Sequence, residues 1–436
     1  MKREYTYKFR LFPTEAQEVL LNKHFGSIRW VYNHFLDRRN SFYLNAKEKQ
    51  LAKKSLNYLD DAKALTELKQ LPETEWLYEC NAQSLQHALK HLDGAFNRFY
   101  KKLGGFPKFK SRRSKQSFRV PQTVEIKDGK LYFTKFMDGI AYDQHREVDG
   151  EIQNATIVKN PAGHYFACIG VTRDIQHKPK VEKTIGIDLG IKTLVAGSDG
   201  TTYPNIKPYR NLEKLIAQRT KAFERTKRVK TDEIDSDGKS VVVDSKGRTK
   251  AREYLAKVYN RAANIRSNHL HHISSKIVNE NQVIVMEDLN VAGMMKNRKL
   301  SKSIWDCSWS ELTRQIMYKA EWYGREVVKI DRFYPSSKTC GACGFINRDL
   351  KLEDREWTCP RCSLKHDRDR NAANNILRQG LNLTNQNRSG TTGLAECLGV
   401  RPTTQKVVGN RLARKSGCSK GDGSPSSETQ PSLAAG

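Results

Sequence analysis

The sequence predicts a mixed α/β protein of about two or three domains, because its 436 residues exceed what one hydrophobic core usually fills. Helical patterning dominates up to about residue 100, and strand-like runs separated by turns follow over residues 120–172. From Lys183 onward, short apolar strands alternate with long helical segments. Two Cys-x-x-Cys pairs near residue 350 predict a small metal-stabilised element.

The amino-terminal part begins with an amphipathic strand. Between Tyr5 and Leu11 apolar residues alternate with polar and basic ones, which predicts one buried face and one largely cationic face. A capping box from Thr14 to Gln17 opens a helix, and residues 82–100 carry the apolar stripe of an amphipathic helix. Turn signals at residues 128–129 and 160–163 indicate that residues 120–172 form a small antiparallel sheet or barrel.

The second part begins with an apolar strand, residues 184–190, that carries Asp188, and a second strand follows at residues 193–197. Helical segments are expected at residues 212–228 and 251–278, and the polar insert between them is interpreted as an exposed, mobile loop.

A buried strand, residues 283–286, then ends in Glu287. A capping box from Ser308 to Glu311 opens a further helix, and residues 327–330 form another strand. Residues 381–436 lack a core-forming pattern, so we expect a disordered basic tail.

The charge of the chain is strongly positive. Lys and Arg number 77 against 48 Asp and Glu, a formal net charge of +29, which predicts a polyanionic partner such as nucleic acid. No apolar stretch approaches the ~18 residues of a membrane-spanning helix, and the first residues lack the apolar segment of a signal peptide. We therefore expect a cytoplasmic protein without a membrane partner.

Three acids occupy positions where a carboxylate is costly unless a cation compensates it. Asp188 lies in an apolar strand, Glu287 ends another, and Asp369 is expected in the first turn of a helix. Together they can converge on divalent metal, and phosphodiester cleavage uses two Mg²⁺ ions roughly 4 Å apart in such oxygen ligands. The alternative is that Asp188 and Asp369 pair with neighbouring Lys and Arg.

Four cysteines have the spacing of a zinc site. Cys340 and Cys343 are separated from Cys359 and Cys362 by fifteen residues, which matches the pattern of a tetrahedral Cys₄ site. Four thiolates fill the coordination sphere, so we expect one structural Zn²⁺. His366 is a ligand only if a cysteine is displaced.

Four motifs occur in order along the chain: Gly186-Ile187-Asp188-Leu189-Gly190, Met286-Glu287-Asp288-Leu289, Tyr334-Pro335-Ser336-Ser337-Lys338-Thr339-Cys340, and the run from His366 to Ile376. With them the chain, up to about residue 380, resembles the TnpB family of transposon-encoded, RNA-guided DNA endonucleases, which are similar to compact type V CRISPR effectors. The resemblance implies a Mg²⁺-dependent (or Mn²⁺-dependent) endonuclease that makes double-strand breaks at guide-complementary targets beside a short transposon-associated motif.

The resemblance also implies site residues and partners. Asp188, Glu287 and Asp369 match the catalytic, magnesium-binding triad, and Asp367 is the runner-up for the third position. The implied partners are a guide RNA derived from the transposon end and a double-stranded DNA target, and we expect a monomer with its RNA.

The fold implied by the resemblance has an RNase H-like (RuvC) nuclease domain interrupted by the zinc element, and a wedge-like β-barrel with an inserted helical recognition lobe. On this sequence the wedge takes residues 1–12 and 103–180, the lobe 13–102, the nuclease domain 181–337 and 364–380, the zinc element 338–363, and the tail 381–436.

Candidate contacts to nucleic acid lie in the amino-terminal half. Eight Lys or Arg alternate with Phe106, Phe109 and Phe118 between residues 101 and 119, a mixture suited to phosphates and stacked bases, although a solvated loop is the alternative. The helix at residues 82–100 offers Gln86, which can pair bidentately with adenine, although a solvated face explains its polar residues nearly as well. The candidates are Gln83, Gln86, Lys90, Lys108, Lys110, Arg112, Arg113, Arg119 and Thr123.

Two other functions remain open at this point. A zinc-ribbon DNA-binding accessory or regulator of a mobile element accounts for the charge and the cysteines but leaves the three acids unexplained. An unguided resolvase or RNase H accounts for the acids but not for the long basic region before Lys183.

Overall fold

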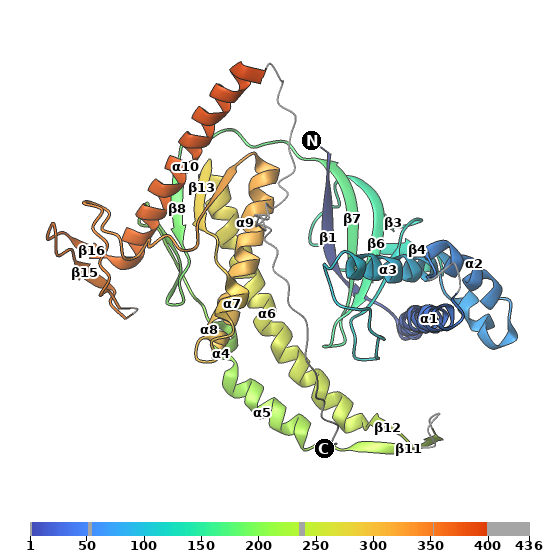
Figure 1. Ribbon diagram of the computed structural model, residues 1–436. Helices are drawn as coiled ribbons and strands as arrows, with labels where there is room; N and C mark the ends of the chain where they lie inside the picture. The colour runs from blue at the N-terminus through green and yellow to red at the C-terminus, as the bar shows by residue number, and fades with distance from the viewer. Residues whose placement is uncertain (1, 51–54, 235–239, 352, 399–436) are drawn as a thin grey trace, which may run out of the picture. The chain divides into compact units, whose positions relative to one another are not determined.

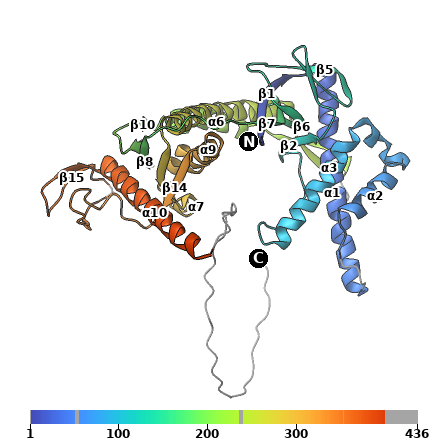
Figure 2. The same ribbon diagram turned by 90° about the horizontal axis from the view of Figure 1, so that it is seen from above.

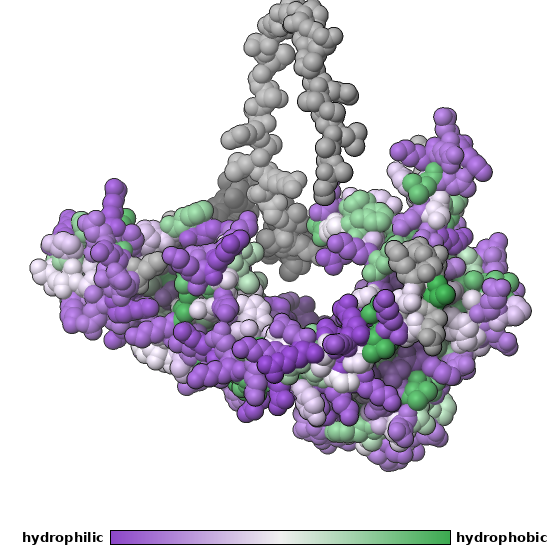
Figure 3. Space-filling view, turned by 90° about the horizontal axis from the view of Figure 1, so that it is seen from below, coloured by the Kyte–Doolittle hydropathy of each residue, from purple (hydrophilic) through white to green (hydrophobic). Residues whose placement is uncertain are grey.

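The computed structural model describes residues 2–50, 55–234, 240–351 and 353–398 (Figure 1). The chain divides into two compact units, Met1–Leu383 and Thr384–Gly436. Hydrophilic side chains cover most of the face in Figure 3. Among the described residues, no helix combines the length and the apolar character that a membrane crossing requires.

A seven-stranded antiparallel sheet organises the amino-terminal half, with the order β2-β6-β7-β1-β5-β4-β3. Its strands are β1 (Lys2–Phe12), β2 (Gln116–Val120), β3 (Glu125–Lys127), β4 (Lys130–Phe133), β5 (Phe136–Tyr142), β6 (Glu151–Lys159) and β7 (Tyr165–Asp174). The predicted antiparallel sheet is confirmed, and β1 pairs along its length with β7. Along β1 the side chains of Phe9 and Leu11 are buried while those of Lys8 and Arg10 are exposed, as the alternation predicts.

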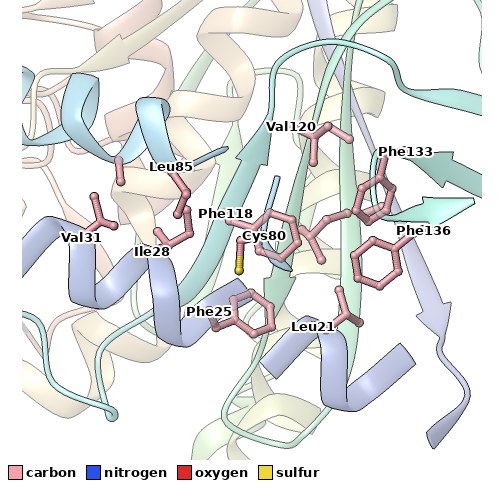
Figure 4. Packing of buried hydrophobic residues seen from close by; sticks show 14 of the residues in the cluster. Leu21, Phe25, Ile28, Val31, Cys80, Leu85, Phe118, Val120, Phe133 and Phe136 are labelled. Carbon is pink, nitrogen blue, oxygen red and sulfur yellow. The ribbon is translucent and has the colours of Figure 1, made fainter. Parts of the chain in front are cut away.

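Helices α1 (Glu15–Glu48), α2 (Tyr58–Leu68) and α3 (Ala82–Tyr100) and the 3₁₀ helix η1 (Pro72–Glu79) join β1 to β2. The predicted capping box is present, because Thr14 Oγ1 accepts from the Gln17 amide at 3.3 Å and Gln17 Oε1 accepts from the Thr14 amide at 3.1 Å. Leu21 and Phe25 of α1 pack with Leu85 of α3 against the sheet (Figure 4). Phe118 belongs to the same core and is 2% exposed, so its prediction as a base-stacking residue is wrong.

A five-stranded sheet organises the second half, with the order β10-β9-β8-β13-β14. Its strands are β8 (Thr184–Asp188), β9 (Thr193–Gly197), β10 (Thr202–Pro204), β13 (Val283–Glu287) and β14 (Glu326–Ile330). The central strands β8, β13 and β14 are parallel, and β9 and β10 are antiparallel additions at one edge.

Helices cover both faces of this sheet. Helices α6 (Lys246–Glu280) and α9 (Trp309–Tyr323) lie side by side (Figures 1 and 2) and pack on Ile284 and Met286 of β13. Helix α10 (Arg368–Leu398) packs on the opposite face, where Ile376 meets Val285. Four shorter helices connect these elements: α4 (Pro208–Asn211), α5 (Glu213–Glu224), α7 (Val291–Met294) and α8 (Ser301–Cys307).

The polar insert differs from the prediction of a loop. Strands β11 (Arg228–Ile234) and β12 (Ser240–Asp244) pair as an antiparallel hairpin, and α6 already begins at Lys246. The run of three valines at 241–243 explains the strand, because β-branched residues favour extended backbone. Residues 235–239 of the insert lie outside the described residues.

Two further predictions need correction. Helix α9 begins after Ser308, but Ser308 is in the left-handed region (φ 51°) and makes no side-chain cap, so the predicted capping box is absent. Helix α10 continues to Leu398, so residues 381–398 are helical rather than disordered. The first proline after the helix start is Pro402, and the packing of Leu383 beside Ile376 carries the helix past residue 381. Residues 399–436 lie outside the described part of the chain.

Candidate nuclease site and zinc centre

Asp188 and Glu287 end neighbouring parallel strands at the same edge of the sheet. Strands β8 and β13 pair from Thr184 and Val283 to Ile187 and Met286, so the two acids are the next residues in register. The strand therefore ends at Asp188, although the sequence had predicted that it continues to Gly190.

The alternation of side chains along a strand decides which face these acids occupy. Ile187 and Met286 pack toward α6 and α9, so Asp188 and Glu287 point to the opposite face, on which α10 lies. Neighbouring strands are ~4.8 Å apart, which places the two carboxylates in one site.

Two glycines allow α10 to lie close to this face. A Cβ at Gly186 would be 2.3 Å from the carbonyl oxygen of Ala373, and one at Gly380 would be 2.2 Å from Cγ1 of Val285. Only glycine fits at such distances. The close approach brings Asp369, in the first turn of α10, to the cleft that Asp188 and Glu287 line.

The structure separates Asp369 from its neighbour Asp367. Asp367 directly precedes α10, and its Oδ1 accepts the backbone N–H of Arg370 at 2.8 Å, which is the geometry of a helix N-cap. Asp367 does not line the cleft with Asp188, whereas Asp369 does. Geometry therefore favours Asp369 as the third acid and gives Asp367 a structural task.

The three carboxylates line a cleft of about 800 Å³. Burial, with the negative charges of Glu287 and Asp369, raises the pKa of Asp188 to about 7, and burial also raises the pKa of Glu287. Mutually repelling carboxylates of this kind fit a hard divalent cation such as Mg²⁺. The cleft lining also holds seven cationic side chains that suit a phosphate backbone: Lys192, Lys207, Arg210, Lys299, Lys302, Arg355 and Arg368.

Sequence reasoning missed the residues that orient these acids. Ser336 Oγ donates to Glu287 Oε1 at 2.5 Å, and Asn375 Nδ2 donates to the backbone carbonyl of Ser336 at 2.9 Å. Arg355 Nη1 donates to Asp369 Oδ1 at 3.2 Å. The sequence gives only a partial signal for Asn375: Asn371 and Asn375 are four residues apart and so share one face of α10, but nothing in the sequence identifies their partners.

Asn371 and Asn375 bind the segment that leads into the first cysteine pair. Asn371 Oδ1 accepts the Gly341 amide at 2.9 Å, and both asparagines donate to the Thr339 carbonyl at 2.7 Å. The same helix therefore positions an acid in the cleft and the beginning of the zinc element.

The four predicted cysteines converge. The sulfur atoms of Cys340, Cys343, Cys359 and Cys362 all lie within 4.8 Å of one another. Two of the separations are 3.6 Å, close to the ~3.8 Å between ligands of a tetrahedral zinc with Zn–S bonds of ~2.3 Å. The cluster can therefore hold one structural zinc.

Each cysteine pair is followed by a left-handed residue that turns the chain back. Gly344 has φ 74° and Ser363 has φ 59°, and the carbonyls of Cys340 and Cys359 accept the amides of these two residues. Strand β15 (Glu356–Thr358) leads into the second cysteine pair and pairs with β16 (Lys365–Asp367), which leads directly into α10. His366 lies outside the sulfur cluster, and its Nε2 is 3.0 Å from Cys340 Sγ, a distance at which an Nε2–H donates to a thiolate.

The predicted nucleic-acid residues fall into three places. Gln86 and Lys90 are exposed on α3, whereas Gln83 is partly buried and donates to Gln122 at 2.8 Å, beside Thr123. Thr123 is left-handed (φ 58°) and bonds to Thr134. The exposed cations Lys108, Arg112 and Arg113 lie in the connection before β2.

Lys110 and Arg119 meet in a pocket of about 250 Å³ that also includes Arg29, His87 and His91 and whose lining holds no carboxylate. Burial lowers the pKa of Lys110 to about 8, and its Nζ lies 3.7 Å from the centre of the Tyr32 ring. The pocket suits an anion.

Three family models match the chain. "Helix-turn-helix domain" matches residues 1–48, "Probable transposase" matches 166–298, and "Cas12f1-like, TNB domain" matches 309–376. The second range contains Asp188 and Glu287, and the third contains Asp369 and the four cysteines. Over residues 2–48 the structure shows one strand and a single 34-residue helix, without two helices joined by a turn.

Similar proteins cover most of the chain. A Streptomyces pristinaespiralis protein named "Putative RNA-guided DNA endonuclease" is 35% identical over 379 residues, which are 86% of this chain and 89% of that protein. The Escherichia coli K12 protein "Putative RNA-guided DNA endonuclease InsQ" is 28% identical over 397 residues, 87% and 93% of the two chains. A cryo-EM structure of a Cas12f1–sgRNA–target DNA complex aligns with 16% identity and a TM-score of 0.48 over 84% of this chain and 83% of that one. This chain therefore belongs to the TnpB/IS605 family.

Proposed function

We propose that this chain is an RNA-guided DNA endonuclease of a mobile element. The observation that carries the proposal is the convergence of Asp188, Glu287 and Asp369 from two strand ends and a helix start in one cationic cleft. The names of the two long relatives support the same activity. A DNA-binding accessory without cleavage does not need this arrangement of acids.

From these contacts we infer a role for each group of residues in the cleft. Asp188, Glu287 and Asp369 would hold two Mg²⁺ or Mn²⁺ ions, which activate water and stabilise the leaving oxygen in phosphodiester hydrolysis. Ser336 orients the Glu287 carboxylate and Arg355 orients that of Asp369. The lysines and arginines of the lining bind the phosphates of the strand to be cut.

The finer domain assignment is part of this proposal. The five-stranded sheet with helices on both faces supports an RNase H-like (RuvC) nuclease domain at residues 181–337 and 364–380, and the sulfur cluster supports a zinc element at 338–363. The seven-stranded antiparallel sheet supports a wedge at residues 1–12 and 103–180, with the helical lobe 13–102 inserted. The partners would be a guide RNA from the transposon end and duplex DNA carrying a short adjacent motif.

The triad is tested by substitution. We expect Asp188→Ala, Glu287→Ala and Asp369→Ala each to lower DNA cleavage by about a thousandfold or more while nucleic-acid binding persists, since their task is metal ligation. Asp367→Ala is the matched control, and it should lose about 1 kcal/mol of stability through the N-cap but keep its cleavage chemistry. Binding of RNA and DNA without cleavage by the wild-type chain in Mg²⁺ and in Mn²⁺ would instead support a regulator.

A further inference from the structure

An aromatic cluster beside the cleft has no task in the proposed chemistry. Tyr209 of α4 lines the cleft. Its ring stacks on Tyr259 of α6, with centroids 6.1 Å apart, and meets the edge of Trp305 of α8 at 5.2 Å. Tyr259 and Trp305 are 40% and 41% exposed, so both rings remain accessible on either side of Tyr209.

A buried carboxylate fixes the rings relative to the cleft. Asp306 is 4% exposed, and its two oxygens accept the backbone amides of Tyr209 and Arg210 at 3.1 and 3.3 Å. Arg266 of α6 lies 4.0 Å from the same carboxylate and donates to the Trp305 carbonyl at 3.3 Å. Because Asp306 joins α4, α6 and α8, the cluster is organised before a ligand arrives.

The charges around the rings identify the class of ligand. The Arg266 guanidinium lies 4.2 Å from the centre of the Trp305 ring, and Lys207 and Arg210 line the adjoining part of the cleft. Exposed rings with cations around them fit a chain of flat bases on a phosphate backbone, because the bases stack while the phosphates pair with the cations.

We propose that Tyr209, Tyr259 and Trp305 form a stacking platform for unpaired bases of the DNA strand that enters the cleft. The proposal rests on the function proposed for the cleft and adds a contact beside it. Stacking tolerates any base, so the platform positions a strand without reading its sequence. It thereby determines which phosphodiester lies beside Asp188 and Glu287.

The test uses the full chain with its bound RNA and the Glu287→Gln substitution, so that DNA is bound but not cut. The probe is a fluorescein-labelled single-stranded DNA, with 2-aminopurine at successive positions in parallel samples. We expect Trp305→Ala and Tyr259→Ala each to weaken binding about tenfold and to relieve the quenching of 2-aminopurine at one or two positions. Trp305→Phe should restore affinity to within about threefold, since a ring remains.

Tyr78→Ala is the matched control. Like the platform rings, Tyr78 is exposed (49%) and has a cation beside it, with Lys69 Nζ 4.2 Å from the centre of its ring. It lies on η1, however, which does not line the cleft. This substitution should leave binding and quenching unchanged. Thermal denaturation shows whether each variant is folded. If Trp305→Ala does not fold, the binding and quenching measured with Tyr259→Ala test the platform in its place.

Three outcomes overturn the platform: no binding of the strand, unchanged binding and quenching in the alanine variants, or an equal loss of affinity for the RNA. A different result would separate the two proposals. If the strand binds through Trp305 but the protein with all three acids intact does not cut DNA, the stacking platform is supported and the proposed function is refuted.

Discussion

Replacing Gly186 by alanine tests whether the approach of α10 to β8 assembles the site. The added Cβ would lie 2.3 Å from the Ala373 carbonyl oxygen and 2.7 Å from the Leu377 amide nitrogen. These are backbone atoms of α10, so no side-chain rotation relieves the contact. A carbon and an oxygen normally stay ~3.3 Å apart, and α10 must therefore move by about 1 Å.

This shift predicts one effect on stability and one on the rate of cleavage. Overpacking of a close-packed core costs about 1–3 kcal/mol, and we expect this loss of stability in Gly186→Ala. A displacement of about 1 Å at a reacting centre costs on the order of a hundredfold in rate. Because Asp369 moves with α10, cleavage should fall about a hundredfold in protein that is still folded.

The assay is single-turnover DNA cleavage with thermal denaturation measured in parallel. Gly247→Ala is the control, since a Cβ there meets only Ser245 Oγ at an ordinary 3.9 Å. Gly380→Ala should also be impaired, and the added substitution Val285→Ala should rescue it by removing the two methyl groups in the way. Wild-type cleavage by folded Gly186→Ala would show that the close approach of α10 to β8 does not assemble the site.

Three further predictions concern the elements around the site. Cys340→Ser should lose the single zinc, by elemental analysis, and unfold β15 and β16; an active, zinc-free wild type would exclude the site. Ser336→Ala should lower cleavage about 10–100-fold and raise the Mg²⁺ concentration required, because Glu287 loses its orienting hydrogen bond; an unchanged Mg²⁺ titration would contradict this. Although burial acts to raise it, hydrogen bonds from Lys183 and Thr201 lower the pKa of Asp199 to about 2. Its ionised form therefore contributes about 1–2 kcal/mol above pH 4 that is lost as the pH falls toward 2, and urea unfolding of Asp199→Asn should lack this pH dependence.

The acids can be predicted from the sequence because the free-energy cost of burying a carboxylate is already indicated by the apolar residues of its own strand. An acid at the end of an apolar strand needs compensation wherever that strand packs, so Asp188 and Glu287 can be recognised before the fold is known. The convergence of these acids with Asp369 depends on the register of β8 with β13 and on the space that Gly186 leaves for α10. Neither property can be read from a single strand.

Residues that act through a backbone carbonyl are harder to predict. Asn375 matters because its amide meets the Ser336 carbonyl, 39 residues away in sequence, and a polar residue in a helix gives no indication of such a partner. Local pattern alone does not separate Asp367 from Asp369, which only the family resemblance ranked. The start of α10 makes Asp367 an N-cap and places Asp369 in the cleft. Phe118 is likewise ambiguous until β2 buries it beneath α1 and α3.

Redirected cleavage separates an RNA-guided endonuclease from a nuclease that acts without a guide. The wild-type chain and Asp188→Ala are each loaded with two RNAs that differ only in the guide segment, and cleavage of two matching DNA duplexes is followed in Mg²⁺. We predict that each RNA directs the wild-type chain to its own target alone, and that Asp188→Ala binds both targets and cuts neither. Equal cutting of both targets whatever the RNA would rule out RNA-guided recognition, and cutting by Asp188→Ala would rule out Asp188 as a catalytic residue.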